Sequence, residues 1–259
     1  YRRALRYNPC EGAALNGLGV VQRARGDLGS AAATFERLAV LRPRDAAAHF
    51  NLAGTSLEAA LRAPRGARAD SLLRVADAAF GVCIELGYRT SEARLRRADI
   101  HLRLGQASLA AAEAQALLRD PGQGSAARLL AGRAALAAGR PQDAVVVLAP
   151  AFQADSLGLD GLGVLGKAYL QLAMPQYAAR VLQRAHERDP GEWRTTVNLA
   201  VALSESGDLQ GAEALLRPLA TEHPEQPEVL QNLAAVLQRR GQRSEANALM
   251  RRVQALREP

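Results

Sequence analysis

The feature that most constrains this chain is a column of small residues that recurs at a fixed interval. Its members are Gly19, Ala53, Ala98, Gly132, Gly166, Ala200 and Ala234. Each step is 34 residues except the one from Ala53 to Ala98, which is 45. A second column, with one step of 45 and otherwise steps of 34, comprises Ala31, Ala76, Ala110, Ala144, Ala178, Ala212 and Ala246. A fixed period of this length is typical of a chain built from stacked supersecondary units.

Each unit has the pattern of two helices around a turn. In the first unit Leu15 and Leu18 follow helical spacing, Gly26 breaks the pattern, and Phe35 and Leu38 resume it. The break recurs in later units at Gly105, Gly139, Gly207 and Gly241. Small residues in both columns would let the two helices approach closely. Aromatic residues are only 4% of the chain, which disfavours a β-sandwich or barrel.

The repeated residues resemble the tetratricopeptide repeat. The resemblance rests on the 34-residue period, Leu18-Gly19, Ala31, Phe35 and Pro43. It implies an all-α fold, an α-solenoid of stacked helix-turn-helix hairpins in a right-handed superhelix of about 15 helices. One departure is Arg97, which takes the usual leucine position of the third repeat. Another is the aromatic position, which is filled by Ala114, Leu148, Leu182, Leu216 and Met250 in later repeats.

On this resemblance, residues 1–259 form a single array. Its segments are 1–11, the second helix of a preceding repeat, and the repeats 12–45, 46–90, 91–124, 125–158, 159–192, 193–226 and 227–259. The two small columns are 12 residues apart except in repeat 46–90, where they are 23 apart, so this repeat holds an insertion of 11 residues. The chain opens at Tyr1 with no initiator methionine or signal-peptide pattern, from which we expect a longer parent chain.

Catalytic motifs are missing from the sequence. There is no HExxH, GxxxxGK[ST] or GxSxG, and the glycines at Gly161 and Gly163 open a helix with no preceding strand. The histidines are scattered over different repeats, and Cys10 and Cys83 lack the spacing of a metal or redox site. The sequence therefore predicts no enzyme, cofactor, metal or small-molecule substrate.

The resemblance implies a concave groove lined by the first helix of each repeat. The groove residues expected to bind a partner are Asn16, Asn51, Arg96, Asp99, Arg133, Lys167, Asn198 and Asn232. Arg96, Arg133 and Lys167 come from consecutive repeats and predict a ligand with acidic residues, because arginine forks pair with carboxylates. The alternative is that these cations are solvated or paired with Asp99 and its neighbours. The asparagines would bind the ligand backbone or their own neighbours.

One subclass of the family clamps a terminal carboxylate with two lysines, two asparagines and an arginine over three repeats. Asn51 and Arg96 match this pattern, but Asn16, Val20 and Glu92 occupy the other positions. A clamp of that kind is therefore disfavoured.

The insertion is the most individual segment of the chain. Arg62, Arg65 and Arg68, with Pro64 and Gly66, predict a basic loop between the helices of the second repeat. Insertions in repeat proteins usually emerge on one face, so the loop is a candidate contact. The alternative is a disordered insertion that the fold tolerates.

The favoured function is a non-catalytic scaffold that binds a protein or peptide. The alternatives are the recognition segment of a larger bacterial enzyme, or a factor for secretion, pilus assembly or the envelope. RNA binding draws on the net charge of +7 but lacks stacking aromatics and is disfavoured. Leu237, Leu249 and Val253 predict an apolar end that would allow self-association. No apolar run is long enough to span a bilayer, and the compartment stays open, with the cytoplasm slightly favoured over the periplasm.

Overall fold

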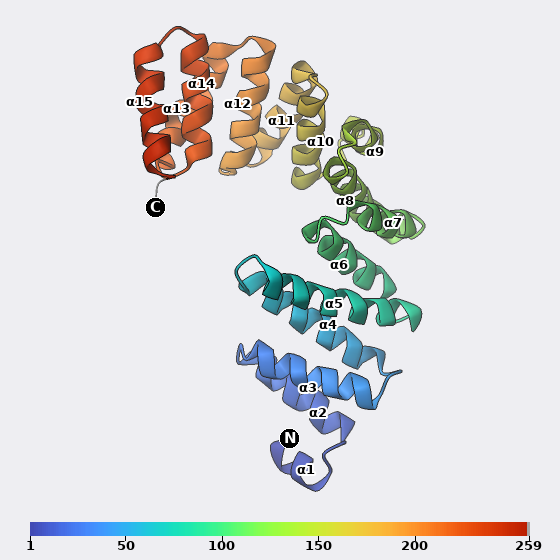
Figure 1. The fold of residues 1–259 in the computed structure, drawn as a ribbon. Helices are drawn as coiled ribbons and strands as arrows, with labels where there is room; N and C mark the ends of the chain where they lie inside the picture. Colours follow the sequence, from blue (N-terminus) through green and yellow to red (C-terminus); the bar gives the residue numbers. More distant parts are fainter. Residues whose placement is uncertain (258–259) are drawn as a thin grey trace. The chain divides into compact units, whose positions relative to one another are not determined.

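The computed structural model describes residues 1–257, and these contain α-helices, one short 3₁₀ helix and no strand (Figure 1). The fifteen α-helices within this range are α1 (Arg2–Tyr7), α2 (Gly12–Ala24), α3 (Leu28–Leu41), α4 (Ala46–Arg62), α5 (Ala67–Glu85), α6 (Thr90–Arg103), α7 (Ala107–Leu118), α8 (Gly124–Ala137), α9 (Pro141–Gln153), α10 (Leu159–Gln171), α11 (Pro175–Arg188), α12 (Trp193–Ser206), α13 (Leu209–Glu222), α14 (Pro227–Arg239) and α15 (Arg243–Ala255), and the 3₁₀ helix is η1 (Pro121–Gln123). The predicted all-α fold is therefore confirmed.

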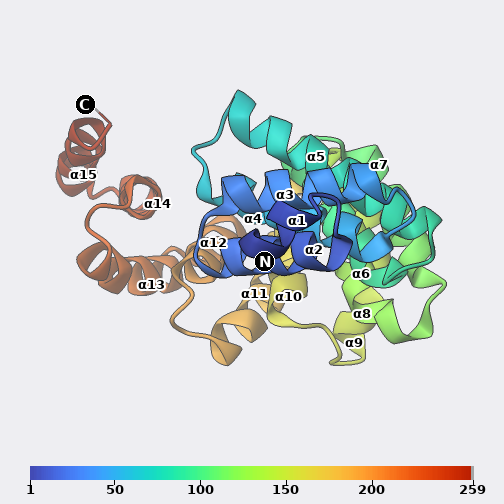
Figure 2. The same cartoon turned by 90° about the horizontal axis from the view of Figure 1, so that it is seen from below.

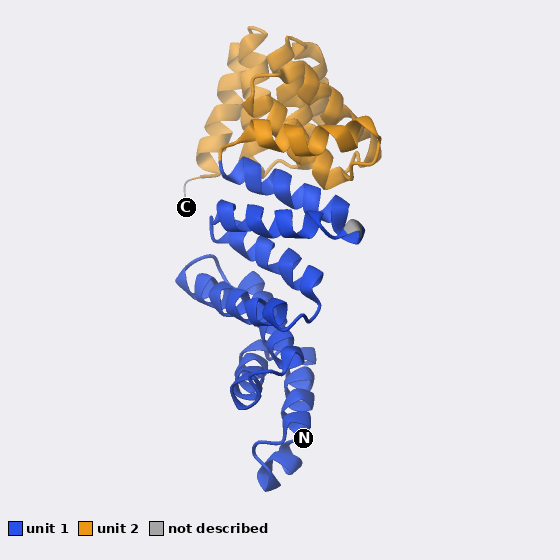
Figure 3. Cartoon of the chain, turned by 90° about the vertical axis from the view of Figure 1, so that its right-hand side faces the viewer, with its two compact units in different colours: residues 1–138 blue, residues 139–259 orange. Residues whose placement is uncertain are grey.

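The chain divides into two compact units, residues 1–138 with helices α1 to α8 and residues 139–259 with helices α9 to α15 (Figure 3). The division falls between α8 and α9, inside the predicted repeat 125–158. The boundaries of the seven repeats stay a prediction.

Each unit is a stack of helical hairpins, in which every helix packs against the next one along the chain. In the first unit α2 packs on α3, α4 on α5 and α6 on α7, and in the second unit α14 lies beside α15 in both views (Figures 1 and 2). First helices of neighbouring hairpins also touch, α6 with α8 in the first unit, and α10 with α12 and α12 with α14 in the second. These contacts place first helices side by side within each unit, as a solenoid of hairpins requires.

Close packing explains the columns of small residues. A Cβ atom added to Gly19 would lie 2.7 Å from the ring of Phe35, and one added to Gly166 would lie 2.5 Å from Leu182. Ala178, one turn before Leu182, has no exposed surface. The first helix therefore needs a small residue where the large side chain of the second helix crosses it.

The turn glycines end the first helix of a hairpin. Gly26 has a φ of 80° and Gly207 a φ of 101°, which is left-handed backbone that glycine adopts without strain. Ala173 lies 34 residues after Gly139 and has a φ of 52°, so an alanine takes the same conformation at this turn. Pro141 and Pro175 are the first residues of α9 and α11, where the missing N–H costs nothing.

The prediction of an exposed apolar end is wrong for two of its three residues. Leu237 is fully buried, Val253 is 2% exposed, and Leu249 is half-buried against the same core as Leu237. The reason is that α15 packs its apolar side onto α14 and leaves a polar side, with Arg251 exposed, outward. Self-association stays a prediction without this support.

Candidate binding cleft beside the extended hairpin

Helices α4 and α5 form the longest hairpin of the described chain because the insertion lengthens both. α4 has 17 residues and α5 has 19, while α2, α3 and α6 to α15 have 12 to 14 each. Between α4 and α5 only residues 63–66 lie outside helix, so the basic loop is shorter than the expected segment from Arg62 to Arg68. Alanine, leucine and arginine favour helix on both sides, and Pro64 and Gly66 interrupt it.

A cleft of about 660 Å³ lies between the end of this hairpin and helices α6 and α8, all in the first unit. Its apolar lining includes Leu61 of α4, Leu73 of α5 and Leu102 of α6. Leu61 is 53% exposed, so the hydrophobic core does not use most of its surface. A concave site with apolar lining and a few polar groups is the usual form of a binding site.

Arginines from three elements also line the cleft. Arg65 comes from the loop, Arg103 from α6 and Arg133 from α8, and they face two carboxylates, Asp70 and Asp99. Asp99 Oδ2 accepts a hydrogen bond from Arg103 Nε at 2.7 Å, and its Oδ1 lies 3.6 Å from Arg133 Nη2. Neither Arg65 nor Asp70 forms an ion pair within residues 1–257. Three arginines and two aspartates give the lining a net charge of +1.

The groove cations of the first unit have partners on the surface. Arg96 lies 3.7 Å from Glu92, whose other oxygen lies 2.7 Å from Arg89. Internal ion pairs of this kind are the alternative to binding an acidic ligand that the sequence left open. Exposed ion pairs of this kind contribute only about 0 to 1 kcal/mol, so a ligand carboxylate can replace the internal partner at little cost.

The asparagines of the groove differ in their contacts. Asn51 Nδ2 donates to Asn16 Oδ1 at 2.9 Å, which joins α4 to α2. Asn232 Nδ2 donates to the carbonyl of Glu228 at 2.8 Å, within its own helix. Asn198 has no hydrogen-bond partner for its side chain among the described residues. Binding of a ligand backbone by these asparagines stays a prediction.

Only one of the three insertion arginines lines the cleft. Arg62 Nη2 donates to Glu58 at 2.7 Å, and Glu58 also accepts from Arg23 at 2.9 Å. Arg68 is exposed, with no ion pair in the described part of the chain, and Arg65 reaches the cleft. Of the predicted contact loop, Arg65 is therefore the residue best placed to meet a ligand.

Lys167 lies on α10 of the second unit, so the expected row of three cations is shared between the two units and stays a prediction. The side chain is exposed and has no ion pair within residues 1–257. In the same unit, α12 and α14 enclose a smaller cleft of about 210 Å³ that Asn232 and Arg239 help to line. Arg239 Nη1 donates to the carbonyl of Ser204 at 2.7 Å and so ties the two helices together.

A charged cluster in the first unit explains why Arg97 departs from leucine. Arg97 Nε lies 2.9 Å from Asp77 of α5, and its Nη1 lies 3.0 Å from Glu113 of α7. Glu113 also pairs with Arg94 at 2.8 Å, and its side chain is only 9% exposed. His101 lies 3.4 Å from Asp77. The sequence signal was the arginine at a leucine position, which the sequence marked as a departure from the repeat without predicting a bridge between helices.

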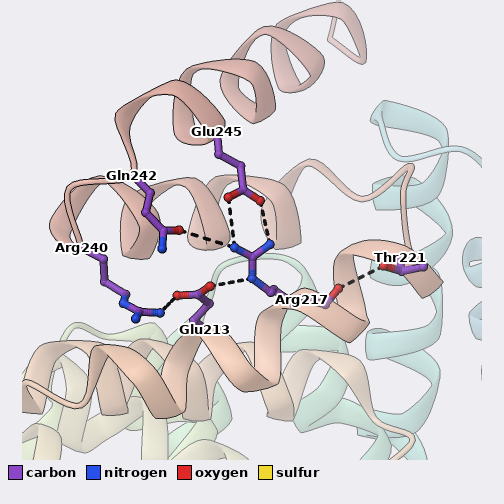
Figure 4. Close-up of polar contacts among 6 residues, drawn as sticks. All are labelled: Glu213, Arg217, Thr221, Arg240, Gln242 and Glu245. Carbon is purple, nitrogen blue, oxygen red and sulfur yellow. Dashed lines mark hydrogen bonds and ion pairs between the residues drawn. The ribbon is translucent and has the colours of Figure 1, made fainter.

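A second cluster joins the last three helices (Figure 4). Arg217 donates to both oxygens of Glu245, at 2.7 and 3.0 Å, and to Glu213 at 2.6 Å, while Arg240 also pairs with Glu213. The hydrogen bonds from Arg217 lower the pKa of Glu245 below its ordinary value, and those to Glu245 raise the pKa of Arg217. The cluster links α13 to α15 and to Arg240, the residue that caps the end of α14.

Groups with reactive chemistry do not converge in the part of the chain that the structure describes. Burial raises the pKa of Cys83 to about 11, so its thiol stays protonated at neutral pH. No three histidine, cysteine or acidic side chains of residues 1–257 are placed to hold a metal ion. None of the described helices combines the length and apolar composition that crossing a bilayer requires.

Comparison with known proteins identifies the repeat. One tetratricopeptide repeat model matches residues 1–46, 87–154 and 164–227, and a second model, also described as tetratricopeptide repeat, matches residues 203–257. No curated protein sequence matches this chain.

Solved structures share the fold at low sequence identity. A tetratricopeptide repeat protein from Parabacteroides merdae ATCC 43184 is 13% identical with a TM-score of 0.71, over 95% of this chain and 93% of that one. MamA 41-end from Desulfovibrio magneticus RS-1 is 18% identical with a TM-score of 0.58, over 65% of this chain and 95% of that one. A chain in the APC/C hetero-tetramer Cut9-Hcn1 is 15% identical with a TM-score of 0.62, over 91% of this chain and 44% of that one.

Proposed function

Because the chain belongs to the tetratricopeptide repeat family, whose fold generally mediates protein–protein interactions, we propose that it is a non-catalytic scaffold that binds an acidic segment of a partner protein. The observation that carries the proposal is the cleft beside α4 and α5, where exposed apolar surface at Leu61 lies next to Arg65, Arg103 and Arg133. An acidic residue followed by an apolar one fits this lining.

The arginines would receive the acidic side chain in two ways. Arg65 has no ion pair within the described residues, so all the N–H donors of its guanidinium group are available to a ligand carboxylate. Arg133 holds Asp99 at 3.6 Å, beyond hydrogen-bond distance, so it can turn to a ligand without breaking a close contact. Arg103 stays on Asp99 at 2.7 Å and keeps that carboxylate from repelling the ligand.

Exposed leucine surface supplies the apolar part of the interaction. Covering Leu61 and the half-buried Leu102 removes apolar surface from water, which stabilises a complex by roughly 25 cal/mol for each Å². The charges then set which segments bind, because the wrong charge next to three arginines is repelled. The Cut9-Hcn1 structure is described as a hetero-tetramer, and its fold similarity supports a role in assembly for this chain as well.

A library of random peptides displayed on phage, selected on the full chain, tests the proposal. We expect enrichment of peptides in which an aspartate or glutamate lies beside an aliphatic residue. Arg65→Glu should weaken the selected peptides at least about tenfold, which is the loss of about 1.4 kcal/mol of binding free energy. Arg68→Glu is the matched control, because it makes the same charge change three residues away and outside the cleft lining.

Two outcomes would reject the proposal. One is equal loss of binding in both variants, which would assign the effect to net charge alone. The other is selection of basic or uncharged peptides by the wild-type chain. If single-stranded RNA bound in a salt-dependent way while no peptide did, the RNA-binding alternative would replace the scaffold.

A further inference from the structure

Three of the ten aromatic residues of the chain gather at one place in the second unit. The rings of Tyr169 and Tyr177 are stacked, with centroids 5.5 Å apart and an angle of 27° between their planes. Phe152 lines the same cleft and is half-buried. Tyr177 is 54% exposed, so burial in the core does not account for its presence. Neither tyrosine hydroxyl has a hydrogen-bond partner within residues 1–257.

The cleft that these rings line has a volume of about 550 Å³. It is formed by α9 and α11, the second helices of their hairpins, with Tyr169 of α10 between them. Clefts of about 300 to 1,000 Å³ are typical for ligand sites. Within the described residues, Tyr169 is the only one of this lining that comes from the first helix of a hairpin, and the lining shares no residue with the cleft beside α4 and α5.

One arginine at this cleft, Arg180, contacts an aromatic ring but has no acidic partner in the described part of the chain. The guanidinium carbon of Arg180 lies 6.0 Å from the centre of the Phe152 ring, a cation–π contact that orients it. The next two arginines of α11, Arg184 and Arg188, share the single carboxylate of Asp155, at 3.0 and 2.7 Å.

The far end of the cleft holds a carboxylate that has no ion pair among residues 1–257. Glu187 lies on α11 about two turns beyond Arg180, and its Oε1 accepts a hydrogen bond from Gln183 at 3.1 Å. Arg184 and Arg188 share one carboxylate, so the positive charge they keep offsets Glu187, and a ligand carboxylate is attracted mainly to the Arg180 end.

We propose that the cleft over α9, α10 and α11 is a second binding site, which takes a peptide segment with an aromatic side chain beside a carboxylate. The aromatic side chain packs against the stacked Tyr169 and Tyr177 rings, and the carboxylate pairs with Arg180. The tyrosine hydroxyls face no internal partner and are available to the peptide backbone. Burial of Tyr169 raises its pKa, as does the neighbouring Tyr177, so its hydroxyl keeps its proton and can donate.

Fluorescence anisotropy of labelled peptides on the full chain tests this site. The probe is a flexible glycine-serine decapeptide with a central Asp-Phe pair, and the reference peptides carry Asn-Phe or Asp-Ala in its place. We expect the Asp-Phe peptide to bind about tenfold more tightly than either reference. Its affinity should fall with added salt, and Arg180→Gln should remove both the salt dependence and about tenfold of the affinity.

Matched variants separate this site from the rest of the surface. Tyr177→Ala removes an exposed ring from the cleft and Tyr7→Ala one from α1, where Tyr7 is 82% exposed. Only Tyr177→Ala should weaken binding, and neither should change the circular dichroism spectrum. Arg65→Glu should leave this peptide bound, so that failure here and failure of the proposed function are distinguishable. Equal binding of the three peptides, or unchanged affinity in both Tyr177→Ala and Arg180→Gln, would overturn the proposal.

Discussion

Two glycines on helix α10 give a direct measure of how tightly the hairpins pack. A Cβ atom at Gly166 would lie 2.5 Å from both Cγ and Cδ2 of Leu182, whereas one at Gly163 would meet nothing within 4 Å. Both substitutions to alanine gain about 1 kcal/mol of helix propensity. Only Gly166→Ala also overpacks the hairpin, at a cost of about 1 to 3 kcal/mol.

The expected results differ in sign. Gly163→Ala should raise the free energy of unfolding by about 1 kcal/mol, and Gly166→Ala should leave it unchanged or lower it by up to about 2 kcal/mol. Hydrogen exchange of the α10 and α11 amides is the preferred assay, because a repeat array can unfold in parts and a single global transition is not assured. Urea denaturation followed by circular dichroism gives the global value.

A third variant identifies the obstacle. In a Leu182→Ala background the clashing atoms are gone, so Gly166→Ala should approach the behaviour of Gly163→Ala, with a coupling energy of about 1 kcal/mol or more. If the two glycine variants already behave alike in the wild-type chain, the close approach of α10 and α11 is not what limits residue size there. If they differ but Leu182→Ala does not reduce the difference, the obstacle is another group.

Three further predictions concern single sites. Ala173→Gly should stabilise the chain by about 0.5 to 1 kcal/mol in urea denaturation, because alanine at a φ of 52° is strained and glycine is not. Thr55→Val should stabilise it by about 1 kcal/mol in the same assay, because the buried Thr55 hydroxyl has no hydrogen-bond partner in the described structure and valine keeps the shape. Glu245→Gln should be less stable than wild type at neutral pH, because it loses the ion pair with Arg217. The difference in stability should close as pH falls from about 4.5 through the lowered pKa of Glu245, because the wild-type carboxylate is then protonated and no longer forms an ion pair with Arg217. Denaturation across pH measures this difference, and a value that is constant down to pH 2 would contradict the prediction.

The fold could be predicted because its determinants repeat. A hairpin can be placed from two properties, the size of a residue and its distance from the next residue of its column. The column through Gly19 and Gly166 shows both properties in the sequence. Position 173 lies one period after Gly139 and one before Gly207, but the residue there is alanine, so the glycine pattern of the sequence does not mark a turn at it. Its left-handed backbone was found only in the structure.

The cleft beside α4 and α5 could be predicted only in part. The insertion and its arginines are visible in the sequence, but the cleft depends on how far the helices extend into it. Because helix continues up to Arg62 and resumes at Ala67, Arg65 lies at the same cleft as Arg133, which is 68 residues later in the chain. Periodicity carries no information on a segment that interrupts the period, so this proximity was visible only in three dimensions.

Residues that depart from the repeat are more informative about function than those that follow it. Within each hairpin the packing needs only a small residue opposite a larger apolar one, and leucine at Leu182 does this as well as the aromatic Phe35. The core of this chain therefore makes little use of aromatic side chains. An exposed Tyr177 stacked on Tyr169 cannot be explained by a requirement that leucine already meets. Ligand binding would explain the tyrosine, and it can be told apart from a role in packing. It requires Tyr177→Ala to lose peptide affinity while the stability of the hairpin is unchanged.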